Sequence, residues 1–199
     1  MLDTTAETAP DRRPAIVICA WDADERAWDP VEDLSGEPWS PGGARTIAIP
    51  SAAPADLAGA LVEQLQDDQT RALLLVGRSS IPKGFQVQMR ADSHALGGEA
   101  RIDAISPSVA RATAHVAEIV RALEDAGLSA SSTSEAEDDA GSYLLYRVLT
   151  SLREGVDTPA VGLLRASANE PDVAVQRAVK AAAEAMARHL SPLPRRRVG

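Results

Sequence analysis

Acidic side chains gather in two short stretches that could hold a hard cation. One stretch follows the first apolar run and one precedes residue 140; they contain Asp22, Asp24, Glu25 and Asp29, and Glu135, Glu137, Asp138 and Asp139. Carboxylate oxygens are the ligands that such cations prefer. Acidic loops are also readily solvated, and Asp139 is explained as the N-cap of a helix starting at Ala140. We therefore predict no metal site and no cofactor.

A serine hydroxyl is the second source of chemistry, at Ser142 near that helix start. Of the three histidines, His115 falls inside a predicted helix and His189 at a helix C-terminus, where both are expected to be structural. His94 lies in the predicted loop "DSHALGGEARID". Ser142 with His94 and an acid, Asp92 or Asp139, would form a hydrolase if loops brought them within about 3 Å. The G-x-S-x-G elbow and glycine-rich phosphate loops are absent from the sequence.

Composition excludes several classes of partner. The net charge is −9 and the isoelectric point about 4.8, so we expect no nucleic-acid binding. The sequence has no signal-peptide pattern and no apolar run long enough for a membrane span, so we expect no membrane association. The single cysteine, Cys19 in "AIVICAW", excludes an intrachain disulfide and is interpreted as a buried apolar residue. A cytoplasmic, bacterial protein is expected.

Strand and helix patterns alternate along the chain. Continuous apolar runs over 15–21, 71–77 and 159–167 are typical of strands buried in a parallel sheet, and a further strand is expected over 44–50. Helical spacing of apolar residues predicts helices over 54–66, 140–155 and 170–190. The alternation favours a three-layer α/β/α sandwich with a mostly parallel central sheet. We expect a flexible leader over 1–14, a single domain over 15–190 and a basic, disordered tail over 191–199.

Three further patterns make predictions that depend on periodicity alone. Alternation over 84–92 predicts one half-buried strand with Phe85, Val87, Met89 and Ala91 inward. A helix is predicted from a cap at Ser106 or Ser108 to Gly127, with Val109 and Ala112 on its core face. In the last helix, Val173 is expected to face inward with Val175, Val179, Ala182 and Met186.

The order of these segments resembles the pyroglutamyl peptidase I (pyrrolidone-carboxyl peptidase) family. The best match is "DAGSYL", similar to the family's Ala-Gly-x-Tyr-(Leu/Val)-Cys-Asn helix start, where Cys is the nucleophile. "LLLVG" followed by "FQVQMRADS" is similar to the strands that precede and carry the catalytic Glu, and "PAVGLLRAS" to the strand with the catalytic His. The resemblance extends over roughly residues 15–190 and implies the family's α/β/α fold.

The sequence departs from the family at the residues that do the chemistry. Gln88 stands at the Glu position and Arg165 at the His position. At the helix start, an alignment without gaps places Leu145 at the Cys position and Tyr146 at the Asn position, whereas a gapped alignment deletes both positions; in either case the thiolate is missing. A cysteine nucleophile needs a base beside it, and Arg remains protonated near neutral pH. The resemblance thus implies a pyroglutamyl-peptidase-like protein that has lost peptidase activity and acts as a cytoplasmic binding or assembly module.

The sequence leaves three readings of that module open. A retained pocket would contain Trp21, Asp22, Gly141, Ser142, Tyr143 and Arg165, and would bind a peptide or a small carboxylate. Alternatively, Arg165 pairs with a local acid and the pocket is filled. A homo-oligomer would place Trp21, Trp28 or Trp39 at a subunit contact. The rival to all three is the hydrolase rebuilt around Ser142 and His94.

Overall fold

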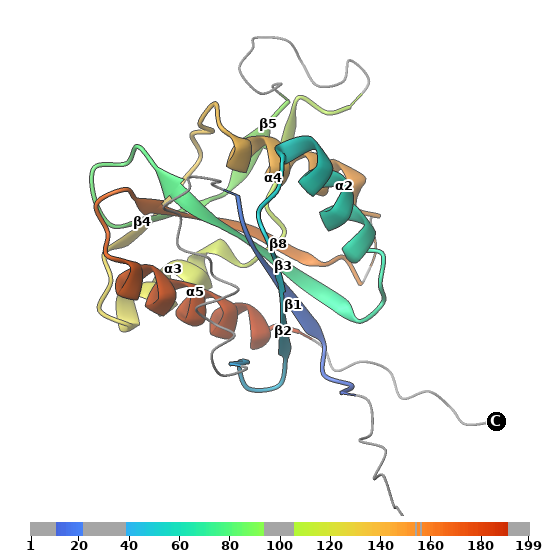
Figure 1. Cartoon of the computed structure of the whole chain (residues 1–199), viewed down its shortest axis with the longest axis horizontal. Coiled ribbons are helices and arrows are strands. Elements are labelled where there is room, and N and C mark those ends of the chain that lie inside the picture. Colours follow the sequence, from blue (N-terminus) through green and yellow to red (C-terminus); the bar gives the residue numbers. More distant parts are fainter. Residues whose placement is uncertain (1–10, 22–38, 94–105, 154, 156, 191–199) are drawn as a thin grey trace, which may run out of the picture.

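A six-stranded, mostly parallel sheet forms the centre of the computed structural model, which describes residues 11–21, 39–93, 106–153, 155 and 157–190 (Figure 1). The strand order is β2-β1-β3-β8-β4-β7. These strands are β1 (Ala15–Ala20), β2 (Arg45–Ile49), β3 (Thr70–Ser79), β4 (Phe85–Gln88), β7 (Ala130–Thr133) and β8 (Ala160–Ser167). Only the β4–β8 pairing within this sheet is antiparallel. The predicted leader and tail lie mostly outside the described residues.

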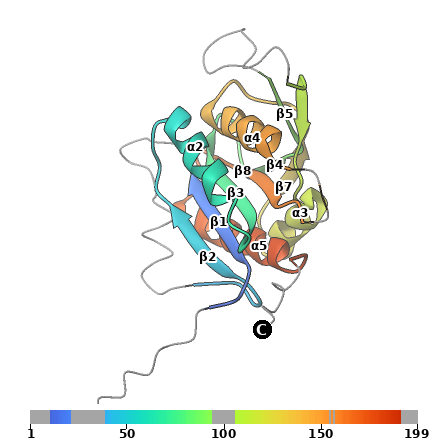
Figure 2. The same ribbon diagram turned by 90° about the vertical axis from the view of Figure 1, so that its right-hand side faces the viewer.

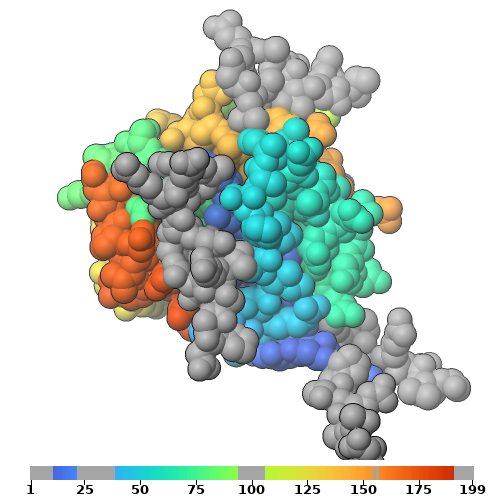
Figure 3. All heavy atoms as spheres, viewed as in Figure 1, coloured from blue at the N-terminus to red at the C-terminus, as the bar shows by residue number. Residues whose placement is uncertain are grey.

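Two pairs of helices cover the two faces of the sheet, which gives the expected three layers (Figure 2). One layer contains α2 (Pro54–Gln64) and α4 (Ala140–Ser151), and the other contains α3 (Val116–Asp125) and α5 (Asp172–Ala187). The first pair also forms part of the surface in the space-filling view (Figure 3), where the teal residues are those of α2.

Alternation along the strands divides the core in two. Ile16 and Ile18 of β1 pack in the cluster under α3 and α5, whereas Val17 and Cys19 pack in the cluster under α2 and α4. The same alternation on β8 directs Leu164 to the first cluster and Leu163 to the second. Because successive strand residues point to opposite faces, the side chain of Arg165 lies on the α4 face, like that of Leu163.

The predicted helix over 106–127 is wrong in its first half. Val109–Arg111 form β6, which pairs with β5 (Arg90–Asp92) in a separate two-stranded antiparallel sheet. Helical hydrogen bonds begin at His115, and neither Ser106 nor Ser108 caps α3. Thr113 Oγ1 donates to Pro159 O and accepts from Val161 N. The segment that follows β6 is therefore hydrogen-bonded to the start of β8.

Two predicted core positions are also corrected. The expected strand over 84–92 divides into β4 and β5 at Met89, which is 39% exposed, because β5 leaves the main sheet to pair with β6. Val173 is 70% exposed in the first turn of α5, whereas Val175, Val179, Ala182 and Met186 are buried as predicted. Val175 and Val179 are one turn apart, and the inward stripe begins with them.

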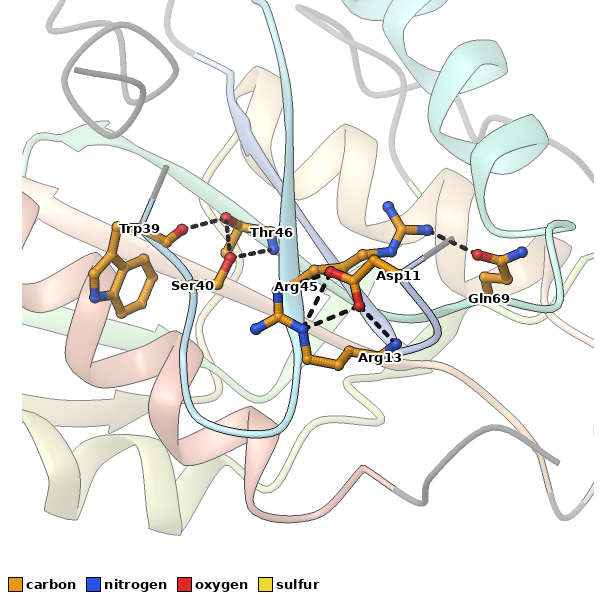
Figure 4. Close-up of polar contacts among 7 residues, drawn as sticks. All are labelled: Asp11, Arg13, Trp39, Ser40, Arg45, Thr46 and Gln69. Carbon is orange, nitrogen blue, oxygen red and sulfur yellow. Dashed lines mark hydrogen bonds and ion pairs between the residues drawn. The ribbon is translucent and has the colours of Figure 1, made fainter. Parts of the chain in front are cut away.

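Hydrogen bonds hold the edge strand β2 to its neighbours (Figure 4). Thr46 Oγ1 donates to Trp39 O at 2.6 Å, and Thr46 N donates to Ser40 Oγ at 3.2 Å. Arg45 donates to Gln69 Oε1 at 3.1 Å. These contacts tie β2 to the residues just before it and to the residue just before β3, while β2 pairs with β1 in parallel through its backbone.

Candidate functional site

Arg165 is the largest polar side chain buried in the described part of the protein, with 0% of its surface exposed. A buried guanidinium is costly unless charges and hydrogen bonds compensate it. Its Nε donates to Gln88 Oε1 at 2.8 Å, and its two terminal nitrogens both donate to the carboxylate of Asp139. One of them also donates to Ser142 Oγ at 2.8 Å. We call Arg165, Gln88, Asp139 and Ser142 the Arg165 network.

Asp139 joins the network to the start of α4. Its backbone is extended at the N-cap, and its Oδ1 accepts a hydrogen bond from Ser142 N at 2.8 Å, as predicted for a cap. The same carboxylate forms a bidentate pair with the guanidinium, the strong form of this interaction. Glu137 adds a second acid 3.6 Å from Arg165 Nη1. Arg165 therefore pairs with local acids, as one of the alternatives from the sequence predicted.

Gln88 completes the network from the neighbouring strand. Gln86 is the register partner of Arg165, so Gln88, two residues along β4, lies on the same face of the sheet. Its Nε2 donates to Arg90 O at 2.7 Å and reaches Ser142 Oγ at 3.3 Å. The amide therefore accepts from the guanidinium on one side and donates on the other, which both defines its orientation and excludes a role as a base.

Ser142 is held as a hydrogen-bond acceptor. It is 6% exposed, and its hydroxyl oxygen receives hydrogen bonds from Arg165 and Gln88. A nucleophilic serine needs a partner that removes its proton. Neither the guanidinium nor the amide does so near neutral pH. Among the described residues, the side chains that donate to the hydroxyl can orient and bind a group but cannot activate the hydroxyl.

Trp21 covers the network beside Gly77 and Gly141. Gly77 is the register partner of Arg165, and a Cβ on Gly77 would lie 2.2 Å from Cε2 of the Trp21 indole. A Cβ on Gly141 would lie 2.7 Å from the same atom. Both glycines are therefore required by the close approach of the ring. The ring centroid is 5.5 Å from Arg165 Cζ, within cation–π range.

The indole N–H of Trp21 is buried and makes no hydrogen bond among the described residues. Trp21 is only 7% exposed, so water does not readily replace the missing acceptor. A buried donor without a partner costs about 1–3 kcal/mol. The indole of Trp21 is therefore buried with its ring in close contact with its neighbours, but its N–H is left without a hydrogen-bond acceptor among the described residues.

The remaining predicted site residues lie in or beside an apolar cluster, or outside the described residues. Leu145 is fully buried in the apolar cluster under α2 and α4, and Tyr143 is half-buried beside the same cluster. Asp22 and His94 lie outside the described residues. His115 is the N-cap residue of α3 rather than a residue within it, and its ring stacks on that of His189 with centroids 4.1 Å apart.

Cys19 is buried as predicted and is no substitute nucleophile. Burial raises the pKa of its thiol to about 12, so the reactive thiolate does not form near neutral pH. Among the described residues, no group of three or more His, Cys, Asp or Glu side chains is arranged to hold a metal ion. In that same part of the chain, no helix combines the length and apolar character needed to cross a membrane.

Sequence reasoning missed Gly77 and the contact of Glu137 with Arg165. The signal for Gly77 was the glycine that interrupts the apolar run of β3, since a strand glycine often marks a close approach. The signal for Glu137 was only its place in an acidic stretch, which does not specify a partner.

Solved structures resemble this arrangement over most of its length. Pyroglutamyl peptidase I from Bacillus amyloliquefaciens superimposes with a TM-score of 0.75 at 15% identity, covering 89% of this chain and 96% of that one. The fold is that of pyroglutamyl peptidase I. Pyrrolidone carboxyl peptidase from Thermus thermophilus gives 0.68 at 16% identity, covering 85% and 98%. That from Thermococcus litoralis gives 0.69 at 15% identity, covering 87% and 93%.

The likeness to pyroglutamyl peptidase I is visible in three dimensions rather than in sequence. No protein-family model matches the chain, and a search of curated protein sequences gives no match. The fold implied by "DAGSYL" and the strand order is thus confirmed, while identities of 15–16% leave the activity to be argued from the site itself.

Proposed function

We propose that this protein is a pyroglutamyl-peptidase-like protein without peptidase activity, which acts as a binding or assembly module in the cytoplasm. The observation that carries the proposal is the Arg165 network. Gln88 and Arg165, at the positions that the resemblance assigns to Glu and His, contact each other at 2.8 Å. Their side chains form a closed set of donors and acceptors with Asp139 and Ser142 in place of a base and its orienting acid.

The third family position supports the same proposal. Leu145 stands where the resemblance places the nucleophilic Cys, and its side chain is fully buried among apolar residues. A leucine side chain has no lone pair or ionisable group with which to attack a carbonyl. Loss of activity therefore does not rest on any one substitution.

The geometry also bears on the ligand. A small carboxylate at Arg165 would have to displace Asp139, whose two oxygens already accept from both terminal nitrogens of the guanidinium. It would also have to displace the N-cap of α4. The site therefore favours a neutral group or a peptide over a small anion, and a homo-oligomer remains part of the assembly proposal.

Hydrolysis of a fluorogenic pyroglutamyl amide tests the proposal. Purified protein is compared with buffer, with the Bacillus amyloliquefaciens enzyme as the positive control, and with Cys19→Ala and Ser142→Ala variants. We expect no turnover above buffer for any form of this chain. Turnover by the unaltered protein would contradict the proposal. Its loss in Ser142→Ala would favour the rival hydrolase built around Ser142, and its loss in Cys19→Ala would implicate the buried thiol.

A further inference from the structure

The indole of Trp21 occupies a slot shaped by residues that belong to other elements. Gly77 of β3 and Gly141 of α4 supply backbone without side chains where the ring passes, and Arg165 of β8 lies near the ring. The backbone at both glycines therefore approaches the planar ring too closely to allow a Cβ, and a cation lies beside the ring. Cation–π attraction favours an aromatic ring there, and the hydrogen bonds of Arg165 do not require a charged ligand.

Two observations distinguish this ring from an ordinary core side chain. Its N–H is buried without an acceptor, so the occupied state carries a cost that release of the ring into water would remove. Its backbone is fixed independently, because Trp21 N donates to Val76 O at 3.0 Å. The side chain can therefore leave by rotation about its own bonds while β1 stays paired with β3.

We propose that the slot between Gly77 and Gly141 is a binding site for a planar aromatic ring, and that Trp21 is a displaceable internal occupant of it. An aromatic side chain of a partner peptide or a small aromatic molecule competes with Trp21 for the slot. Because Trp21 is tethered, its effective concentration is high and an external ring needs further contacts to displace it. This proposal rests on the proposed function, since it takes the site as one that binds rather than one that cleaves.

Exchange of the indole N–H with solvent tests displacement in the unaltered protein. With ¹⁵N-labelled tryptophan, we expect the Trp21 N–H to be protected at least about tenfold less than the core amide of Leu74 after correction for intrinsic rates. Low concentrations of denaturant should leave the Trp21 exchange unchanged, because a ring rotation exposes little surface. Protection equal to that of Leu74, with the same denaturant dependence, would overturn the proposal.

Binding of indole tests the ring preference. In a Trp21→Gly variant we expect indole to raise the melting temperature in a saturable way, whereas a Trp39→Gly variant should show no such rise. A Trp21→Gly protein that indole does not stabilise would overturn the slot. A peptide carrying one tryptophan, added to the same variant, distinguishes a partner segment from a free small molecule by which of the two binds more tightly.

A glycine substitution tests displacement by fluorescence in a protein that keeps Trp21. In a background of Trp28→Phe and Trp39→Phe, Gly141→Ala places a Cβ 2.7 Å from the ring and should shift the Trp21 emission to the red as the indole moves into water. Gly59→Ala is the control, since nothing lies within 4 Å of a Cβ there. Unshifted emission in Gly141→Ala would count against displacement. None of these measurements depends on turnover, so their failure would leave the proposed loss of activity untouched.

Discussion

The Nε of Arg165 donates to Oε1 of Gln88 at 2.8 Å across the single antiparallel pairing of the main sheet. This contact joins two strands at the positions where the resemblance to pyroglutamyl peptidase I expects a His and a Glu. An enzyme of that kind would use the pair to move a proton. Here the same pairing places a guanidinium against an amide and joins β4 to β8 on the α4 face of the sheet.

Removing the charge of Asp139 should be costly. Asp139→Asn keeps a good N-cap but leaves the buried Arg165 with Glu137 as its only acid among the described residues. We expect the free energy of unfolding to fall by about 3–5 kcal/mol, as when one partner of a buried pair is lost. Urea titration measures it. Asp138→Asn is the control, since Asp138 is exposed and carries the same charge; an equal loss in both would mean that the pair adds nothing specific.

Leu145→Cys should leave the protein inactive. The variant restores the thiol at the family position but in a fully buried apolar setting without a base, so the thiolate does not form. We expect no cleavage of a pyroglutamyl amide and slow reaction with a thiol reagent. Turnover in this single variant would show that some other side chain serves as base, and would contradict the proposed role of Arg165.

The pH dependence of stability should contain a contribution from Cys19. Burial raises the pKa of its thiol from 9.0 to about 12, so between these values the unfolded chain has lost a proton that the folded chain retains. Stability therefore falls as pH rises, by about 1 kcal/mol per pH unit above pH 9. Cys19→Ala should show a shallower loss over pH 9–11 in urea titrations. Parallel curves for the two proteins would contradict the pKa assignment.

The two valines at the start of α5 should differ in their effect. Val173→Ala should change the free energy of unfolding by less than about 0.5 kcal/mol, because the side chain is exposed. Val175→Ala should cost roughly 2 kcal/mol through lost burial and the cavity left behind. Both variants carry the same Val→Ala substitution, so each serves as the control for the other. A larger loss at Val173 would indicate that another molecule covers this position in solution.

Much of the fold follows from local patterns, and the failures have physical causes. Apolar runs identified β1, β3 and β8 because buried parallel strands have no solvated face. The Ser- and Thr-rich β7 has no such run, since it is an edge strand with one neighbour. The residues of β6 were assigned to a helix because Val109, Ala112 and Val116 have helical spacing, while their pairing with β5 depends on contacts remote in sequence.

The site was predictable in part for the same reason. Gln88 and Arg165 were indicated by the resemblance to pyroglutamyl peptidase I, and Asp139 by its place before a helix. That Asp139 also neutralises Arg165 depends on how the start of α4 lies over β8, which no local pattern specifies. The close fit of Trp21 to Gly77 and Gly141 likewise joins three separate elements.

Arg165 requires Asp139 more than Asp139 requires Arg165. This difference constrains the order in which the two residues could have arisen. Asp139 is useful alone, because it caps α4 through Ser142 N. Arg165 is fully buried and requires an acid already in place. An ancestral chain could therefore acquire the carboxylate first and the arginine second. Once both are present, a histidine in place of Arg165 would leave that carboxylate without its cation, so a replacement at position 165 also requires a change at position 139.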